Sequence, residues 1–470
     1  MRLTEVEFKR KLSLSMYKDL RLMLAKMSMA KDFVNDKRGD LYPLLSRSQD
    51  AVETVAEHCY TVTGGAERIL CQFFPYATYE LTYRGNGECG FVFRFGERAA
   101  AVTREGDVIR FRTDGFSEQR SAEGKGEGSL IVSCRPLAFD VFLRCEGGAI
   151  YLASFSDPSL PDTCAESVFT EATVSLLACD VTVTEAISYI DNGISIADIR
   201  PIRYENGEIM YEDGKVYLTA SIRLIEGKHQ GIFSWVPGTA EFALTGAVYY
   251  HTGDGLWCGD VAASILYHRA ERAWYLWVCS FSHGHILAHA VMQGDPRFGV
   301  NVADVTLMQQ GEPDGDRTAF LGFSGDEDPD FFFDAERGIW SMAICRLDPE
   351  SRAYRYHFFE SERPFDGYRY IGRGMAGAET GGSFVSVGGE RFFLCGNDFQ
   401  ARSDYRIYAK DGMHNAKFNL PDGGFRGWGS LIPIKMGSRT RYLWLTFDRH
   451  KGSEYNWSYG NLYCFEAYGL

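Results

Sequence analysis

The chain has 470 residues, of which 45% are hydrophobic and 24% charged, and its formal net charge is −14. These values exclude a disordered or fibrous protein, and the negative charge disfavours nucleic acid and acidic membrane surfaces as partners. No run of 18 apolar residues and no leader-like apolar stretch occurs, and the twelve cysteines are scattered singly. We therefore expect a cytoplasmic protein with free thiols.

Residues 1–59 show no strand-like alternation of apolar and polar side chains. Apolar side chains recur instead at helical spacing, at Leu20, Met23, Leu24 and Met27. Positions i, i+3, i+4 and i+7 share one face of a helix. The pattern predicts a short helical N-terminal segment over residues 1–59.

From residue 60 to residue 196 the pattern changes to short alternating or apolar runs interrupted by Gly and Asp, such as ATYELTYRG, CGFVFRFGE and GDVIRFRTDG. Such runs predict the antiparallel strands of a β-sandwich. Their order resembles that of concanavalin-like carbohydrate-binding sandwiches. Glycan binding and a purely supporting role for the next domain are both open for this sandwich.

Residues 197–470 repeat one unit five times: a short apolar strand, a polar turn, and a second strand that is usually rich in aromatic residues. One equivalent position of the second strand falls at intervals of 58, 66, 52 and 49 residues, at Leu218, Leu276, Met342, Leu394 and Leu443. An interval of roughly 50–65 residues is the size of a four-stranded propeller blade. The sequence therefore predicts an all-β protein with a C-terminal five-bladed β-propeller.

The blade pattern brings polar residues together at the centre of the top face, where the innermost strands start and the loops after the second strands return. The expected strand starts carry carboxylates in four repeats, at Glu208, Asp260, Asp328 and Glu379. We expect substrate contacts from these starts and from the returning loops, at Asn206, Asp260, His283, His285, Arg402, Arg426, Trp428, Asp448 and Arg449. Carboxylates held in different environments suit acid and base catalysis of glycoside cleavage.

The third repeat, EDPDFFFD, resembles a strand of glycoside hydrolase family 43 and the related five-bladed arabinanases, xylosidases and fructosidases. The resemblance covers roughly the last 270 residues. It implies that Asp328 tunes the pKa of the catalytic acid and that Glu379 is this acid. The family's aspartate base corresponds to Asn206, and an amide cannot accept a proton from water. We expect Glu208 to act as the base, with Asp198, Glu205 and Asp260 as alternatives.

These observations predict a glycoside hydrolase that cleaves oligosaccharides by carboxylate acid and base catalysis. A phosphorylase or transglycosidase is an alternative, because Arg402, Arg426, Arg449 and His283 would form an anion pocket. A carbohydrate-binding protein without turnover is a second alternative, since Asn206 replaces the base.

A metal bound by His283, His285 and Asp260 lacks a convincing further ligand nearby in the sequence, so we expect these residues to form hydrogen bonds with the substrate. No phosphate-binding or dinucleotide-binding motif occurs. The prediction is therefore an enzyme with no metal and no cofactor, whose partner is an oligosaccharide. A homo-oligomer is compatible with the sequence.

Overall fold

The computed structural model describes residues 28–33, 52–62, 66–122, 126–145, 148–190, 193, 195–224, 227–239, 242–308, 325–347, 353–374, 379–397, 404–417, 428–449 and 459–469. In these ranges the chain is almost wholly strand, with a one-turn helix, α2 (Glu166–Phe169), and a 3-10 turn, η1 (Phe281–His283). The all-β prediction is confirmed. Neither described helix is long and apolar enough to cross a membrane.

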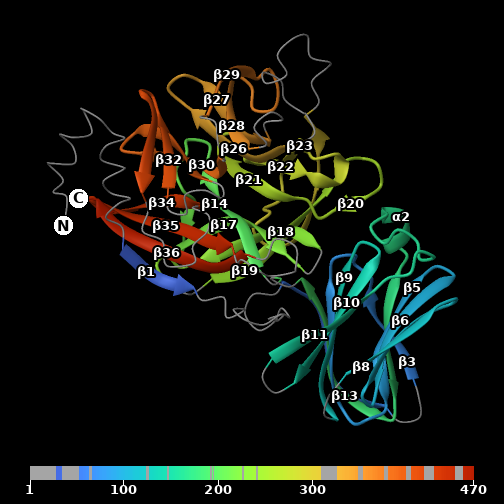
Figure 1. Ribbon diagram of the computed structural model, residues 1–470. Helices are drawn as coiled ribbons and strands as arrows, with labels where there is room; N and C mark the ends of the chain where they lie inside the picture. The colour runs from blue at the N-terminus through green and yellow to red at the C-terminus, as the bar shows by residue number, and fades with distance from the viewer. Residues whose placement is uncertain are drawn as a thin grey trace.

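Two six-stranded antiparallel sheets form a sandwich, drawn in blue to green in Figure 1. The first sheet has the order β11 (Gly148–Phe155), β10 (Ala138–Cys145), β9 (Glu127–Arg135), β4 (Thr78–Arg84), β13 (Val181–Ile190) and β2 (Val52–Val62). The second has the order β3 (Ala66–Gln72), β12 (Thr173–Cys179), β5 (Glu88–Phe95), β6 (Arg98–Glu105), β7 (Val108–Thr113) and β8 (Ser117–Ser121). Alternate side chains such as Tyr79, Leu81, Phe91 and Phe93 fill the space between the sheets.

Five further sheets follow in the described residues. The first sheet contains, in order, β14 (Ser195–Pro201), β17 (Lys215–Arg223), β18 (Lys228–Trp235), β19 (Phe242–His251) and β20 (Trp257–Cys258). The second contains β15 (Arg203–Tyr204), β21 (Val261–His268), β22 (Ala273–Ser280), β23 (Ile286–Met292) and β25 (Thr306–Leu307). The third contains β26 (Asp326–Asp334), β27 (Ile339–Leu347), β28 (Tyr354–Ser361) and β29 (Arg369–Arg373). The short strands β16 (Tyr211–Glu212) and β24 (Gly299–Asp304) pair with β17 and β19.

The fourth sheet contains β30 (Glu379–Val387), β31 (Glu390–Asn397), β32 (Asp404–Ala409) and β33 (Gly412–Lys417). The fifth contains β34 (Trp428–Met436), β35 (Arg439–Arg449), β36 (Tyr459–Gly469) and β1 (Ser28–Phe33). The five positions that set the predicted repeat lie on the second strands β17, β22, β27, β31 and β35. The spacing in the sequence therefore located one strand of each sheet correctly.

The strands β14, β21, β26, β30 and β34, here called the inner strands, contact one another in that order, and β34 contacts β14 again. The Ser430 hydroxyl on β34 donates a hydrogen bond of 2.8 Å to the Ile199 carbonyl on β14, which joins the last sheet to the first. The five sheets therefore form a closed ring, which Figure 1 shows in green to red.

The predicted N-terminal helix is wrong in the part of residues 1–59 that the structure describes. β1 pairs antiparallel with β36, from Ser28 opposite Glu466 to Phe33 opposite Leu462, and β2 begins at Val52 in the sandwich. The open edge of β36 offers a row of backbone hydrogen bonds, and such tertiary pairing overrides a weak helical preference. Leu20, Met23, Leu24 and Met27 lie outside the described residues.

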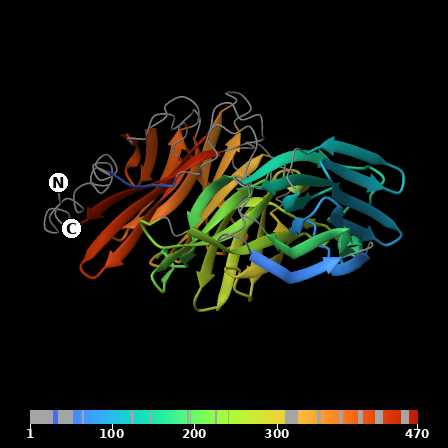
Figure 2. The same ribbon diagram turned by 90° about the horizontal axis from the view of Figure 1, so that it is seen from below.

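The sandwich packs against the first sheet of the ring, and Figure 2 shows the two side by side. The Tyr76 hydroxyl donates to the Trp257 carbonyl and accepts from the Gly259 amide, both at 2.8 Å. Its ring stacks on Tyr249 with the centroids 4.7 Å apart. Sandwich and ring thus share one buried core.

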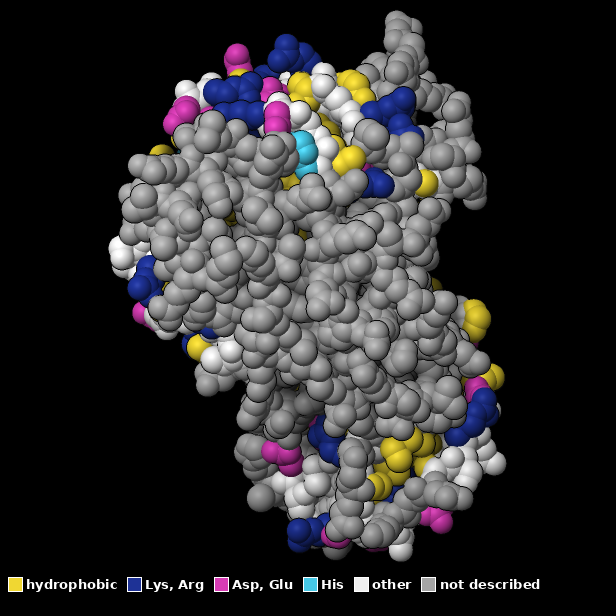
Figure 3. All heavy atoms as spheres, turned by 60° about the vertical axis from the view of Figure 1, so that its left-hand side comes forward, with side chains coloured by type: hydrophobic (Ala, Val, Ile, Leu, Met, Phe, Trp, Pro, Cys, Tyr) yellow, Lys and Arg dark blue, Asp and Glu magenta, His cyan; other side chains and the backbone are white. Residues whose placement is uncertain are grey.

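Figure 3 shows one face of the molecule. Among the described residues on this face, basic side chains (dark blue) and acidic side chains (magenta) are interspersed.

Candidate functional site at the centre of the ring

Four inner strands carry the same irregularity near their starts. A left-handed residue interrupts the regular pairing of each with its second strand, at Asp198, Ala262, Asp328 and Gly381, whose φ angles are 53°, 63°, 47° and 60°. A β-bulge turns the side chain at that position out of the sheet's alternation. Residues other than glycine with left-handed φ are strained, and such strain concentrates at functional sites.

Asp198 and Asp328 therefore form the acidic pair of the ring centre, with only 9% and 6% of their surfaces exposed. The Ser221 hydroxyl donates to Asp198 Oδ2 at 2.6 Å, and the Thr380 hydroxyl lies 3.4 Å from Asp328 Oδ2. Burial, followed by the negative charge of Asp198, raises the pKa of Asp328 to about 7, although Arg200 acts in the opposite direction. Asp328 thus exchanges a proton near neutral pH.

A buried polar network lies along the inner strands next to this pair. Arg200 donates to the carbonyls of Ala262 and Gly382 at 3.2 and 3.4 Å, which ties β14 to β21 and β30. Nearby, Arg203 on β15 forms a buried ion pair with Asp330 on β26, and the Ser264 hydroxyl on β21 donates to the same carboxylate at 2.7 Å. These contacts hold four inner strands in fixed relation, so the two aspartates are rigidly placed.

Two cations lie beside Asp198. Arg223 Nη2 is 3.9 Å from Asp198 Oδ2. Lys228 Nζ lies 3.4 Å above the Phe281 ring, and burial together with Arg223 lowers the pKa of Lys228 to about 8. An aromatic plane next to positive charge suits a sugar ring and its oxygen atoms or an anionic substituent.

Glu327 forms a second acidic point next to Asp328, and both of its contacts come from neighbouring elements. The His285 Nε2 atom lies 3.0 Å from Glu327 Oε1, and the Tyr354 hydroxyl donates to the same oxygen at 2.9 Å. The His285 ring packs against Phe281 at a tilt of 32°, with the ring centroids 4.4 Å apart. The structure therefore brings the predicted contact residue His285 to this acidic cluster. Its contact with a substrate stays a prediction.

The structure places Glu379 at the start of β30, but its carboxylate is buried and fully partnered. Arg406 Nη1 lies 2.8 Å from Oε1, the Tyr408 hydroxyl also donates to Oε1, and the Tyr356 amide donates to Oε2 at 3.1 Å. A guanidinium and a backbone N–H are partners of an ionised carboxylate, whereas a general acid must carry a proton. The geometry therefore does not support the acid role that the resemblance implied for Glu379.

Asn206 and Glu208 are not at the ring centre, contrary to the sequence-based prediction. They lie on the turn between β15 and β16, where Glu208 is 49% exposed on its side chain and faces Lys435 at 3.3 Å and Arg269 at 3.8 Å. Arg269 follows the end of β21, and a strand of eight residues spans about 25 Å. Glu208 thus lies at the opposite end of the inner strands from Asp328.

Asp260 and His283 belong to a separate cluster at the start of β21. Ser280 Oγ donates to Asp260 Oδ2 at 2.8 Å, and the Ser282 amide donates to Asp260 Oδ1 at 3.0 Å. His283 Nε2 lies 2.7 Å from Asp254 Oδ2, a contact that lowers the pKa of Asp254 to about 2 against its burial. Both residues are held by hydrogen bonds within the protein, and their contact with a substrate stays a prediction.

The remaining predicted contact residues lie beyond what the structure describes in detail. Arg402 and Arg426 are outside the described residues. Trp428 begins β34, and Asp448 and Arg449 end β35, but their side chains are outside the description. Their roles stay predictions.

Sequence reasoning gave Asp198 only as an alternative and missed Lys228. Both have a signal in the sequence. Asp198 in SIADIRP and Asp328 in DEDPDFF are each followed, two positions later, by a charged residue. Lys228 is the first residue of β18 and stands two polar residues before the run GIFSW. Recognition of Asp198 required the first inner strand to be placed at β14 instead of after residue 205.

No protein-family model matches the chain, and no curated protein matches its sequence. Among solved structures, the catalytic domain of a GH62 α-L-arabinofuranosidase from Coprinopsis cinerea has 14% identity and a TM-score of 0.39, over 58% of this chain and 91% of that one. Bacillus subtilis levansucrase has 9% identity and a TM-score of 0.39, over 57% and 83%. The galectin LEC-6 from Caenorhabditis elegans has 9% identity and a TM-score of 0.23, over 28% and 94%. These values assign no activity to the chain.

Proposed function

We propose that the chain is a glycoside hydrolase whose five sheets are the blades of a five-bladed β-propeller and whose reacting carboxylates are Asp198 and Asp328. The single observation that carries the proposal is the buried pair at the ring centre, in which the pKa of Asp328 is raised to about 7. Two carboxyl groups that differ in proton affinity are what glycoside cleavage requires.

In this mechanism Asp328 donates its proton to the glycosidic oxygen as the bond from that oxygen to the anomeric carbon breaks. Asp198 is the ionised partner, held by Ser221 and by the charge of Arg223. It either takes a proton from the water that attacks the anomeric carbon or attacks that carbon itself, and both routes end with water added across the bond. Phe281 and Tyr354 offer aromatic surface and a hydroxyl at the rim.

The leaving group separates the roles of the two aspartates and of Glu379. Asp328→Asn is expected to slow hydrolysis of an oligosaccharide by about 100- to 10,000-fold, yet to affect a dinitrophenyl glycoside much less, because that leaving group needs no proton. Asp198→Asn is expected to slow both. If Glu379→Gln instead slows hydrolysis of the oligosaccharide much more than that of the dinitrophenyl glycoside, Glu379 is the general acid.

A panel of aryl glycosides and oligosaccharides tests the proposal as a whole. Product release by the natural chain, lost in Asp328→Asn and kept in the surface variant Asp366→Asn, supports it. Saturable sugar binding without product on long incubation would instead identify a carbohydrate-binding protein and refute turnover.

Phosphorolysis is the second candidate, and Arg223 and Lys228 beside Asp198 favour it because they would attract a phosphate oxygen. Glycosyl phosphate formed only in the presence of inorganic phosphate would identify this reaction. Hydrolysis at the same rate with and without phosphate excludes it.

A reducing compartment such as the cytoplasm is part of the proposal. Cys89, Cys134, Cys279 and Cys345 are buried free thiols in different sheets. Scattered buried thiols are usual where disulfides do not form. Detection of the protein in an oxidising compartment in its native cell would contradict this placement.

A further inference from the structure

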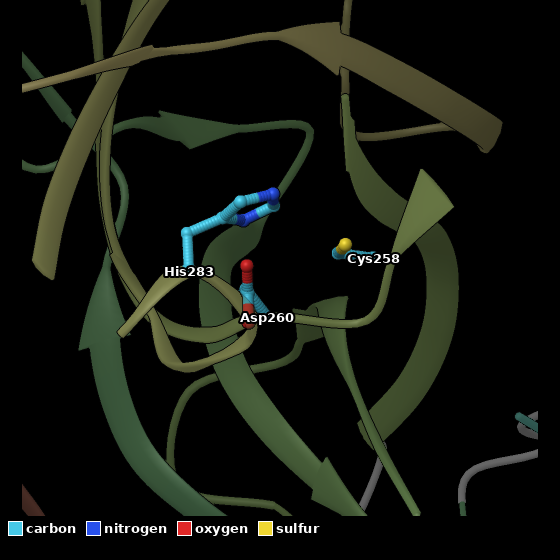
Figure 4. Close-up of side chains that lie close together, drawn as sticks. All are labelled: Cys258, Asp260 and His283. Atoms are coloured by element: carbon cyan, nitrogen blue, oxygen red, sulfur yellow. The ribbon is translucent and has the colours of Figure 1, made fainter. Parts of the chain in front are cut away.

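Cys258, Asp260 and His283 gather at the start of the second sheet of the ring. One ligand atom from each lies within 4.8 Å of the other two. Cys258 is 7% exposed and Asp260 is 1% exposed, so neither is an ordinary surface side chain. Figure 4 shows the imidazole of His283 above the carboxylate of Asp260, with the Cys258 sulfur facing the same space.

The chemistry of these three side chains selects the ion. A thiolate and an imidazole are ligands of zinc, whereas calcium and magnesium take oxygen ligands. Zinc bonds of about 2.0–2.3 Å place tetrahedral ligand atoms about 3.5 Å apart, so small side-chain rotations close the cluster around an ion. We propose that Cys258, Asp260 and His283 form a zinc-binding site with a fourth position open to water.

The surroundings of His283 hold it in the orientation that such a site needs. Its Nε2 atom faces Asp254 Oδ2 at 2.7 Å and the Thr252 hydroxyl at 3.0 Å. Its Nδ1 atom lies 3.0 Å from Ser280 Oγ, which itself bonds to Asp260, so Nδ1 is on the ligand side. A carboxylate behind a histidine ligand fixes its tautomer and strengthens metal binding.

Asp260 is positioned in the same way. The Ser282 amide and hydroxyl both donate to Oδ1 at 3.0 Å, and Ser280 donates to Oδ2 at 2.8 Å. The carboxylate is thereby held toward His283 before any ion arrives. A preorganised ligand loses little freedom on binding, which favours affinity.

The proposed zinc site joins two parts of the chain, residues 258–260 and η1, at the junction of sandwich and ring. Cys258 stands between Trp257 and Gly259, whose carbonyl and amide both bond to the Tyr76 hydroxyl of the sandwich. His283 belongs to η1 and Asp260 leads into β21. A bound zinc ion would therefore clamp the loop that holds the sandwich, close to Lys228 at the ring centre.

Metal binding by the full chain tests the proposal without any glycoside substrate, so its result is independent of the proposed hydrolysis. After dialysis against a chelator, we expect one zinc ion per chain by titration calorimetry and elemental analysis. Cobalt in place of zinc should give the near-ultraviolet charge-transfer band of a cobalt–thiolate bond. Failure of the natural chain to bind either ion would overturn the site.

Variants assign the ligands. Cys258→Ser should abolish the cobalt–thiolate band, and Asp254→Asn should weaken zinc binding about 10- to 100-fold through His283. The matched control is Cys179→Ser, since Cys179 also lies beside a carboxylate, 3.7 Å from Asp180 Oδ2, and belongs to no such cluster among the residues that the structure describes. A band that persists in Cys258→Ser, or disappears in Cys179→Ser, would refute the assignment whether or not any variant loses stability.

Discussion

Asp328→Asn is expected to make the folded protein more resistant to unfolding at neutral and mildly basic pH, although it removes a proposed reacting group. In the folded protein, burial and the charge of Asp198 raise the pKa of Asp328 from 3.8 to about 7. The folded state therefore binds this proton more tightly than the unfolded chain does. The stabilising contribution is fully present below pH 4 and is lost as the pH rises through 7.

The size of the effect follows from the same change. A pKa rise from 3.8 to about 7 corresponds to about 4 kcal/mol of unfolding free energy. Asparagine has nearly the shape of aspartate but does not ionise, so the variant does not incur this loss. Between pH 4 and pH 8 the natural chain should lose about 2–4 kcal/mol more than the variant, because nearby charges readjust in part.

Urea unfolding followed by tryptophan fluorescence across this pH range measures the difference. Titrating groups remote from Asp328 affect both proteins equally, so the gap between the two curves reports Asp328 together with the charges that face it. Asp366 is an exposed aspartate whose side chain is 63% accessible, and the unfolding free energy of Asp366→Asn should equal that of the natural chain at every pH. A gap between Asp328→Asn and the natural chain that stays constant from pH 4 to pH 8 would refute the reasoning.

Three further predictions test neighbouring parts of the structure. Glu379→Gln should lower the unfolding free energy by about 3–5 kcal/mol, because Arg406 stays buried without its counter-charge, and a loss below about 1 kcal/mol in urea titrations would contradict this. Tyr76→Phe should cost about 1–3 kcal/mol and speed limited proteolysis between sandwich and ring, since the Trp257 carbonyl and Gly259 amide lose a partner; unchanged proteolysis would argue against this junction. Glu208→Gln should leave hydrolysis within about twofold, because carboxylates exposed on a turn contribute little, and a large loss in initial rate would restore the base predicted from the sequence.

The repeat was predictable because each second strand combines apolar side chains with a fixed place in the unit. Leu218, Leu276 and Leu443 are wholly buried on β17, β22 and β35. Burial on both faces produces long apolar runs that spacing detects without any knowledge of pairing. The sandwich strands β4 and β5 were predictable for a different reason, because side chains that point alternately to the two faces of a strand give an alternating pattern.

The first inner strand was misplaced because the chain leaves the sheet after Pro201. Between β14 and β17 it makes a detour in which Arg203–Tyr204 joins the second sheet in parallel to β21 and Tyr211–Glu212 pairs with β17. In the sequence, the residues between β14 and β17 have the pattern of a strand followed by a turn, and this pattern predicts the start of the first repeat there. For this reason the predicted base was Glu208. The pairing of β1 at the sheet edge could not be predicted, because its partner β36 lies at the other end of the chain.

The repeated bulge explains why two residues that are 130 positions apart act as a pair. Asp198 and Asp328 occupy the same left-handed position in β14 and β26, while Ala262 and Gly381 occupy it in β21 and β30. Two bulges thus present carboxylates, and the other two present at most a methyl group. Because the bulge fixes the backbone and Arg200 fixes the strands, the fold itself sets both the burial and the closeness to Asp198 that raise the pKa of Asp328. Removing the charge of Asp198 by Asp198→Asn should therefore lower that pKa and shrink the pH-dependent stability gap between the natural chain and Asp328→Asn.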